Sequence, residues 1–125
     1  MMAEKCLLFN NKTAWEKVIS SPKPGLAKDV GRSIKDFDQE TWDQNKCDIV
    51  IKGNIAKFSQ NPDLKEFLLN TKERVLVEAS PLDIIWGVGL DQDNPNISNP
   101  YYWKGSNLLG FCLMEVRDII NSQLL

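Results

Sequence analysis

Histidine is absent from the 125-residue sequence. This absence excludes Ser-His-Asp and Cys-His catalysis, and it excludes metal sites that are built on imidazole ligands. Any proton transfer must therefore fall to carboxylates, lysine, tyrosine, cysteine or water. Two kinds of chemistry need no histidine, namely glycoside cleavage by carboxylates and imine formation by a lysine.

Cysteine is scarce, and long apolar runs are missing. Cys6, Cys47 and Cys112 are an odd number, are widely spaced and contain no C-x-x-C pair. Such a set argues against a disulfide framework or a zinc site and favours free thiols in a reducing cytosol. The sequence shows no signal peptide, and no apolar run approaches the roughly 20 residues of a membrane span. We therefore expect a cytoplasmic protein without a membrane partner.

Neither sign of charge is in large excess. The 15 basic and 17 acidic side chains give a formal charge of -2 at pH 7. No global field then attracts a nucleic acid backbone or an anionic membrane surface. An anionic ligand would have to be held by a few local donors.

The apolar spacing predicts a mainly helical chain. A Thr13-x-x-Glu16 capping box marks the start of one helix, Asp38 caps a long one, and Asn61-Pro62 opens another. The apolar run Arg74-Val75-Leu76-Val77 predicts a short strand. We therefore expect one α+β domain over residues 1–125, mainly helical with a small β-sheet. Its helices are expected over 1–9, from 13 onward, over 26–30, from 39 toward 58, from 62 onward and from 107 toward 123.

The segment after the expected strand carries an acid, an indole and two glycines. Pro81 should end the strand, which leaves Asp83 and Trp86 in a loop with Gly87 and Gly89. Glycines permit a ligand to approach the backbone closely, and scaffolds often present sites on such loops. The alternative is a tight turn around a core tryptophan.

Four further positions are candidates for chemistry, and each has a plainer interpretation. Gly31-Arg32 could place a guanidinium to bind a phosphate or a carboxylate. In the plainer interpretation, Arg32 is a solvated surface arginine. Trp42 stacks on a base or a ribose, or belongs to the core. Asn107 binds a substrate hydroxyl, or caps the last helix. Lys5 is a surface lysine, or a buried amine with a lowered pKa and nucleophilic character.

Together these positions belong to a set of strings that resembles the NADAR superfamily, also called the YbiA-like or swarming motility protein family, over essentially the whole chain. The matching strings, in order, are Ala3-Glu4-Lys5, Lys28-Asp29-Val30-Gly31-Arg32, Phe37-Asp38 with Trp42, Lys57-Phe58-Ser59-Gln60-Asn61, Leu76-Val77-Glu78-Ala79-Ser80, Asp83-Ile84-Ile85-Trp86-Gly87, Asn107-Leu108-Leu109-Gly110 and Leu113-Met114-Glu115-Val116-Arg117.

The resemblance implies an N-glycosidase with an α+β, mainly helical fold and no metal or cofactor. The implied substrates are ribosylaminopyrimidine phosphates of riboflavin biosynthesis, or ADP-ribosylated guanine in nucleic acid. Trp42, Trp86 and the glycines Gly31 and Gly87 would shape the binding site, with Arg32 for the phosphate and Asn107 for a hydroxyl.

Two catalytic roles are compatible with this activity. Asp83 would stabilise positive charge at the anomeric carbon or activate water against it. Lys5 would instead capture the opened ribosylamine as a Schiff base that water then releases.

One part of the family pattern has no counterpart in this sequence. Family members have an N-terminal strand region and a Glu-(His/Gln)-Tyr triplet just before the position of Met1, and that glutamate is usually credited with acid and base work. We therefore expect a domain that is N-terminally truncated relative to the family. Three interpretations stay open: an N-glycosidase, a catalytically impaired module that binds ADP-ribose or another nucleotide, and a purely structural partner domain. Uncovered apolar surface on the first helix and beside the strand makes a homodimer possible.

Overall fold

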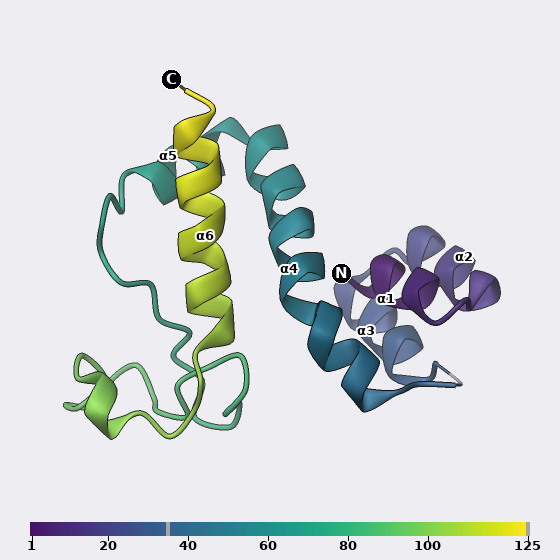
Figure 1. The fold of residues 1–125 in the computed structure, drawn as a ribbon, viewed down its shortest axis with the longest axis horizontal. Coiled ribbons are helices and arrows are strands. Elements are labelled where there is room, and N and C mark those ends of the chain that lie inside the picture. Colours follow the sequence, from purple (N-terminus) through teal and green to yellow (C-terminus); the bar gives the residue numbers. More distant parts are fainter. Residues whose placement is uncertain (35, 125) are drawn as a thin grey trace. The chain divides into compact units, whose positions relative to one another are not determined.

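The computed structural model describes residues 1–34 and 36–124. Helices dominate this part of the chain (Figure 1). None of the helices described combines the length and apolar character needed to cross a bilayer. In chain order the elements are α1 (Met2–Leu8), α2 (Lys12–Ser20), α3 (Pro24–Arg32), α4 (Gln39–Gln60), α5 (Pro62–Leu69), the 3-10 helix η1 (Pro100–Tyr102) and α6 (Leu108–Ser122).

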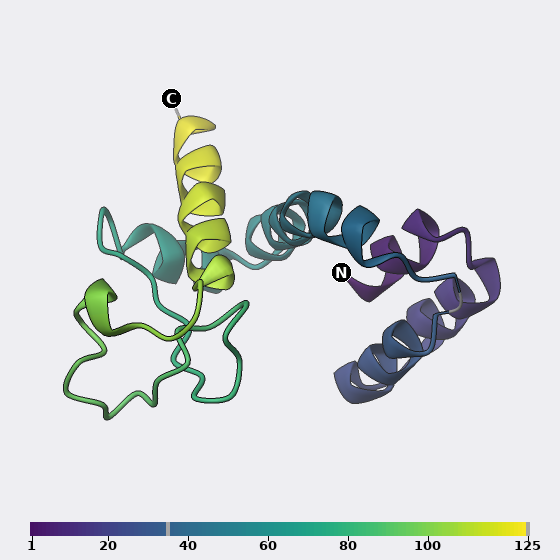
Figure 2. The same cartoon turned by 60° about the horizontal axis from the view of Figure 1, so that its bottom comes forward.

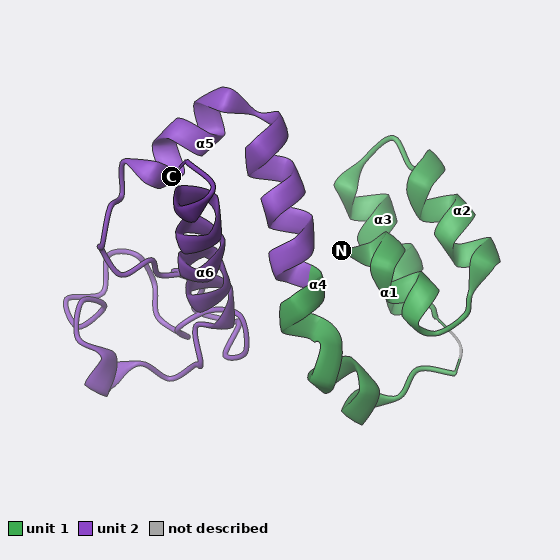
Figure 3. Cartoon of the chain, turned by 45° about the horizontal axis from the view of Figure 1, so that its top comes forward, with its two compact units in different colours: residues 1–49 green, residues 50–125 purple. Residues whose placement is uncertain are grey.

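The chain forms two compact units, which Figure 3 shows in different colours. Unit 1 is Met1–Ile49, and unit 2 is Val50–Leu125. Helix α4 contributes residues to both, and it is unbroken through the β-branched stretch 47–51. The long helix predicted from residue 39 is thereby confirmed.

Helices α1, α2 and α3 pack against one another in unit 1. α2 begins at Lys12, because Asn11 is its N-cap and accepts a hydrogen bond from the Ala14 N–H through its side-chain oxygen at 2.9 Å. The predicted Thr13 capping box is therefore wrong, since the helix already begins at Lys12 and Asn11 is its N-cap. The buried core residues are Cys6, Ala14 and Ile34, with Phe9, Trp15, Val18 and Val30 packed against them.

The start of α4 follows the prediction. The Asp38 Oδ2 atom accepts hydrogen bonds from the Thr41 N–H at 3.0 Å and the Thr41 hydroxyl at 2.6 Å. These two bonds lower the pKa of the Asp38 carboxyl below its ordinary value, because they favour its charged form. Asp38 therefore caps the long helix as an ionised side chain at neutral pH.

Unit 2 has its own core, in which α5 packs against α6. Figure 2 shows α6 as the long C-terminal helix beside α5. The contact rests on an apolar stripe at helical spacing along α6, which the sequence pattern predicts. The core residues are Leu68, Val116 and Ile120, and Ile51, Ile55, Phe58, Leu69 and Leu76 pack against them.

The predicted small β-sheet is wrong. The described part of the chain contains no strand or sheet, so it is helical rather than α+β. Residues 74–78 belong to no regular element, and we call them the extended segment because Leu76 and Glu78 present their C=O and N–H groups to one Asn107 amide, before a turn in which the Ser80 N–H donates to the Glu78 carbonyl. Hydrogen bonds from other parts of unit 2 occupy the backbone groups that a second strand would bind. The Glu78 carbonyl accepts from the Val88 N–H at 3.0 Å, and the Asn107 side chain accepts from the Glu78 N–H and donates to the Leu76 carbonyl. A short apolar run predicts extended backbone, but a sheet also needs a second strand, and here the Asn107 side chain takes the place of that strand.

Candidate functional site

Lys5 lies among aromatic rings in unit 1. Its Nζ atom is 5.0 Å from the ring centroid of Phe37 and 5.1 Å from that of Trp42. Phe37 is itself held by Phe9, with 5.1 Å between the ring centroids. Both distances from Nζ suit cation–π attraction. Trp42 is half-buried and faces the amine, so it is a neighbour of Lys5 as well as a candidate for stacking.

The surroundings of Lys5 lower its pKa below the ordinary value for a lysine. Burial of the side chain is the main cause, and the positive charge of Arg32 acts in the same direction. The Cys6 thiol opposes this lowering, and burial raises the pKa of that thiol in turn. A larger share of Lys5 is therefore neutral, and a neutral amine is the nucleophilic form.

Gly31 and Arg32 lie in the last turn of α3. Gly31 is buried, and a Cβ atom at this position would collide with the Met2 Sδ atom, so the glycine permits the close approach of α1 and α3. Arg32 is exposed and acts on Lys5 through its charge. The structure thus gives Gly31 a packing role and brings Arg32 into the surroundings of Lys5.

Asp83 organises the predicted loop in unit 2. Its Oδ1 atom accepts hydrogen bonds from the N–H groups of Ile85 at 3.0 Å and Trp86 at 2.8 Å. This is the local side-chain to backbone pattern that lets an aspartate hold a turn. The Oδ2 atom makes no hydrogen bond among the residues described, so half of the carboxylate is open.

The same loop covers the N-terminus of α6. The Leu108 N–H donates to the Ile85 carbonyl at 3.2 Å, and the Leu109 N–H donates to the Trp86 carbonyl at 3.1 Å. The first N–H groups of a helix have no partner inside the helix. The loop carbonyls supply such partners here, so the position of Trp86 is fixed by the helix that follows.

Gly87 packs closely against both its own loop and the end of the extended segment. A Cβ atom at Gly87 would lie 2.8 Å from the Asp83 carbonyl oxygen, 3.0 Å from the Ser80 Cβ atom and 3.1 Å from the Glu78 carbonyl oxygen. Two of these neighbours are backbone atoms, which cannot move aside cheaply. A glycine is therefore required for this loop geometry.

Asn107 is fully buried and has a left-handed backbone with φ 53°. Its Nδ2 atom donates to the Leu76 carbonyl at 2.9 Å, and its Oδ1 atom accepts from the Glu78 N–H at 2.9 Å. The side chain makes no cap hydrogen bond to α6. Both ends of the amide thus bind the extended segment, a role that sequence reasoning missed because these partners are about 30 residues away.

The predicted site residues fall into two groups. In unit 1, Lys5, Arg32 and Trp42 share one neighbourhood, and Gly31 packs against the same helix α1. The unit 2 group consists of Asp83, Trp86, Gly87 and Asn107. Phe37 joins the first group although its role was not predicted; its place in the Phe37-Asp38 family string is the hint that the sequence contains.

The comparisons with known proteins identify the family. The family model described as "NADAR domain" matches residues 1–121. The chain belongs to the NADAR family. The resemblance predicted from the ordered strings is thereby confirmed, and it covers both groups of candidate residues.

Several curated proteins are similar to this NADAR chain. The N-glycosidase R617 of Acanthamoeba polyphaga mimivirus is 44% identical over 118 residues, which cover 94% of the chain and 69% of that protein. The N-glycosidase YbiA of Escherichia coli is 31% identical over 103 residues, covering 82% and 58%. The chloroplastic riboflavin biosynthesis protein PYRR of Arabidopsis thaliana is 35% identical over 125 residues, covering 94% and 19%. The names of these relatives agree with the activity that the resemblance implies.

Proposed function

We propose that this NADAR chain is an N-glycosidase-type hydrolase that cleaves the C–N bond between a base and the ribose of a nucleotide-like substrate. The observation that carries the proposal is the Lys5 amine, which lies between two aromatic rings and has a lowered pKa. The names of the mimivirus and E. coli relatives support the reaction class. The three free cysteines suit a reducing compartment, and we place the reaction in the cytoplasm.

The amine supports a covalent route. A ribosylamine opens to an imine at C1, and the neutral Lys5 Nζ atom adds to this carbon. The C1–N bond to the base then breaks, and the base leaves as its free amine because its nitrogen has gained the two protons that the Lys5 amine loses, one on addition and one when the lysine imine forms. Water adds to the lysine imine, which releases the sugar phosphate and returns Lys5 to its starting state. Each step needs only the substrate, water and this side chain.

Asp83 supports a second route to the same products. The open Oδ2 atom of its carboxylate would stabilise the positive charge that develops at C1, or would take a proton from the attacking water. The Oδ1 atom meanwhile keeps the loop in place through Ile85 and Trp86. This route predicts no covalent adduct.

The substrate class follows from the side chains near these groups. Trp42, beside Lys5 in unit 1, is a half-buried indole that suits stacking on a base or a sugar, and the half-buried Trp86 indole beside Asp83 in unit 2 suits the same role there. The exposed guanidinium of Arg32 suits a phosphate. A ribosylaminopyrimidine phosphate of riboflavin synthesis has all three parts, and the name of the Arabidopsis relative favours it over ADP-ribosylated guanine.

Borohydride trapping separates the two routes. The protein is incubated with a ribosylaminopyrimidine phosphate in the presence of borohydride, and its mass is compared with that of Lys5→Ala and Lys5→Arg. We expect a sugar phosphate adduct on the natural sequence and none on either variant, because Arg keeps the charge without a nucleophilic amine. A Lys5→Ala enzyme with full turnover would eliminate the lysine route.

A catalytically impaired module that binds ADP-ribose or a related nucleotide is the second candidate. The Asp83 carboxylate favours it, because one of its oxygens is already engaged in the turn. Incubation with the ribosylaminopyrimidine phosphate and, separately, with ADP-ribosylated guanine distinguishes the two functions. Release of the base supports the hydrolase, whereas binding without release identifies the binding module.

A further inference from the structure

The extended segment 74–78 in unit 2 has two different edges. One edge is occupied, since Leu76 and Glu78 bind the Asn107 amide and the Glu78 carbonyl accepts from Val88. In an extended chain the N–H and C=O groups of alternate residues point to the same side. The groups of Val75 and Val77 therefore point to the other edge.

That other edge is open. Among the described residues, no hydrogen bond involves the N–H or C=O group of Val75 or Val77. Their side chains are 61% and 36% exposed, which is unusual for valines beside a core. An edge of this kind is a ready template for another extended chain.

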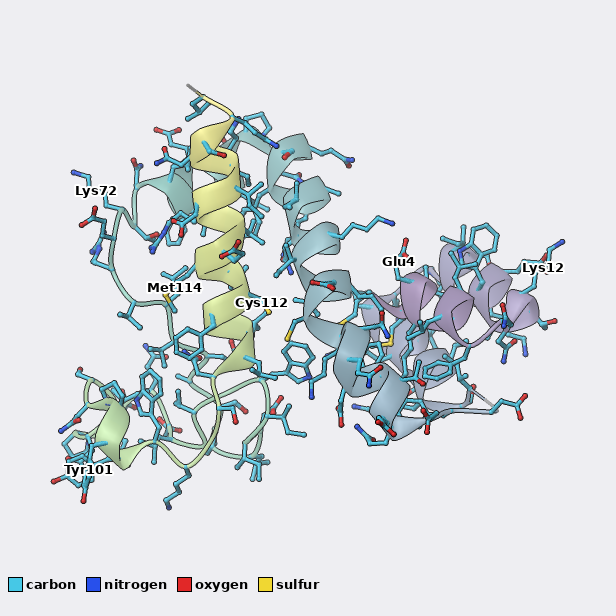
Figure 4. All side chains as sticks on the ribbon, in the orientation of Figure 1. Glu4, Lys12, Lys72, Tyr101, Cys112 and Met114 are labelled. Atoms are coloured by element: carbon cyan, nitrogen blue, oxygen red, sulfur yellow. The ribbon has the colours of Figure 1, made fainter. Side chains whose placement is uncertain are left out.

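Val75 and Val77 also line an open groove of about 790 Å³. The Trp103 indole N–H donates to the Ile97 carbonyl at 2.8 Å and so stiffens the far wall. Tyr101 projects outward from η1 on the same loop and is 87% exposed (Figure 4). The apolar lining consists of Val75, Val77 and Ala79 on one wall and Ile97, Pro100 and Trp103 on the other.

We propose that the occupant of this edge is the same segment of a second copy of the chain, paired antiparallel around Leu76. The charges of the segment favour this partner. Arg74 and Glu78 flank Val75-Leu76-Val77 at equal distances, so an antiparallel copy centred on Leu76 places each Arg74 opposite a Glu78. Opposite charges directly across a strand pair are favourable, and a closed two-fold dimer repeats the contact twice.

The hydrogen bonding fits the same register. Val75 lies opposite Val77 of the second copy, and these two residues carry the open groups. Each such pair exchanges two N–H to C=O bonds, which gives four main-chain bonds across the two-fold axis. Leu76 meets its own copy as a non-bonded pair, in agreement with its carbonyl being already bound to Asn107.

Both charged side chains are available for this contact. The Arg74 Nε atom donates to the Thr71 carbonyl, and its Nη2 atom donates to the Asn70 carbonyl. The Nη1 atom remains available to a carboxylate. The Glu78 carboxylate makes no hydrogen bond or ion pair among the residues described. The pairing therefore replaces no contact that either side chain already has.

Charge reversal tests the register. Sedimentation over a concentration series should show a dimer for the natural sequence. Arg74→Glu and Glu78→Arg each place like charges opposite each other twice, so each should weaken the dimer by at least about tenfold. An equimolar mixture of the two variants restores both opposite-charge pairs and should regain the dimer as a heterodimer. A natural chain that stays monomeric, or a mixture no tighter than its components, overturns the proposal.

A proline tests the hydrogen bonds separately from the charges. Val77→Pro removes an N–H that has no partner within the chain, and Leu76 before it is already extended, so the unit should keep its fold. Val77→Thr is the matched control, because it keeps both the N–H and the β-branched shape. The helical circular dichroism should be the same for both, while only the proline variant loses the dimer. Equal dimer affinity for the two variants contradicts the proposed pairing.

Discussion

The Nζ atom of Lys5 lies over the ring of Trp42, 5.1 Å from its centroid. An aromatic face attracts the charged form of an amine, whereas burial and the Arg32 charge favour the neutral form. Burial is the main cause of the lowered pKa of Lys5, and the Arg32 charge adds to it. Lys5 is therefore held in place by contacts of its cation and is still easier to deprotonate than a surface lysine.

A pH profile of covalent trapping tests this balance. Only the neutral amine adds to an imine, so the adduct should form faster as the pH rises and should level off below the pH at which an ordinary lysine titrates. Arg32→Gln removes a charge that lowers the pKa of Lys5, so the profile should move to higher pH. Lys17→Gln changes the net charge equally on α2 and should leave the profile in place. Equal shifts for both variants would assign the effect to net charge.

Gly31 offers a test of the packing that positions Lys5. In Gly31→Ala the new Cβ atom meets the Met2 side chain, which must change its rotamer, so we expect a loss of about 1 kcal/mol in unfolding free energy. Gly25→Ala lies in the same helix with no atom within 4 Å and should gain up to about 1 kcal/mol from helix propensity. Denaturant titration of both variants measures the difference. A Gly31→Ala protein as stable as Gly25→Ala would show that α1 and α3 tolerate more space.

Asn107 should carry much of the local stability of unit 2. Asn107→Ala leaves the Leu76 carbonyl and the Glu78 N–H without partners, at a cost of about 2–4 kcal/mol in unfolding free energy. Asn54→Ala is the matched control, because its amide only adds to the Val50 carbonyl within α4. Thermal unfolding should show a large loss for the first variant and a small one for the second. Similar losses would mean that the extended segment does not depend on Asn107.

The sequence predicts those features of this fold that depend on near neighbours. The Asp38 cap and the stripe along α6 are encoded within one or two helical turns, so their patterns are sufficient. The edge of the extended segment is different, because its partner is a side chain from the start of α6. No local pattern in residues 74–77 contains that information, and the apolar run therefore predicted a sheet that is absent from the described residues.

The candidate site also has features that the sequence predicts and features that depend on contacts between distant residues. Chemically distinctive residues such as Lys5 and Asp83 stand out in the sequence, and the ordered strings identify the family. The neighbours of Lys5 could not be predicted, since the Phe37 ring and the Arg32 charge come from other parts of unit 1. Only packing brings these groups together, so the roles of individual residues required the structure.

Asp83 allows its structural and chemical roles to be separated with two substitutions. Asp83→Asn keeps an oxygen that accepts from Ile85 and Trp86, so the loop should persist, but the negative charge is lost. If that charge stabilises the transition state, turnover should fall by about 100-fold with nearly unchanged substrate affinity. Asp83→Ala also frees both N–H groups, so it should weaken binding as the loop loosens around Trp86. Unchanged turnover in Asp83→Asn together with a lysine adduct would leave Asp83 as a holder of the loop, because the chemistry would then need only the amine of Lys5.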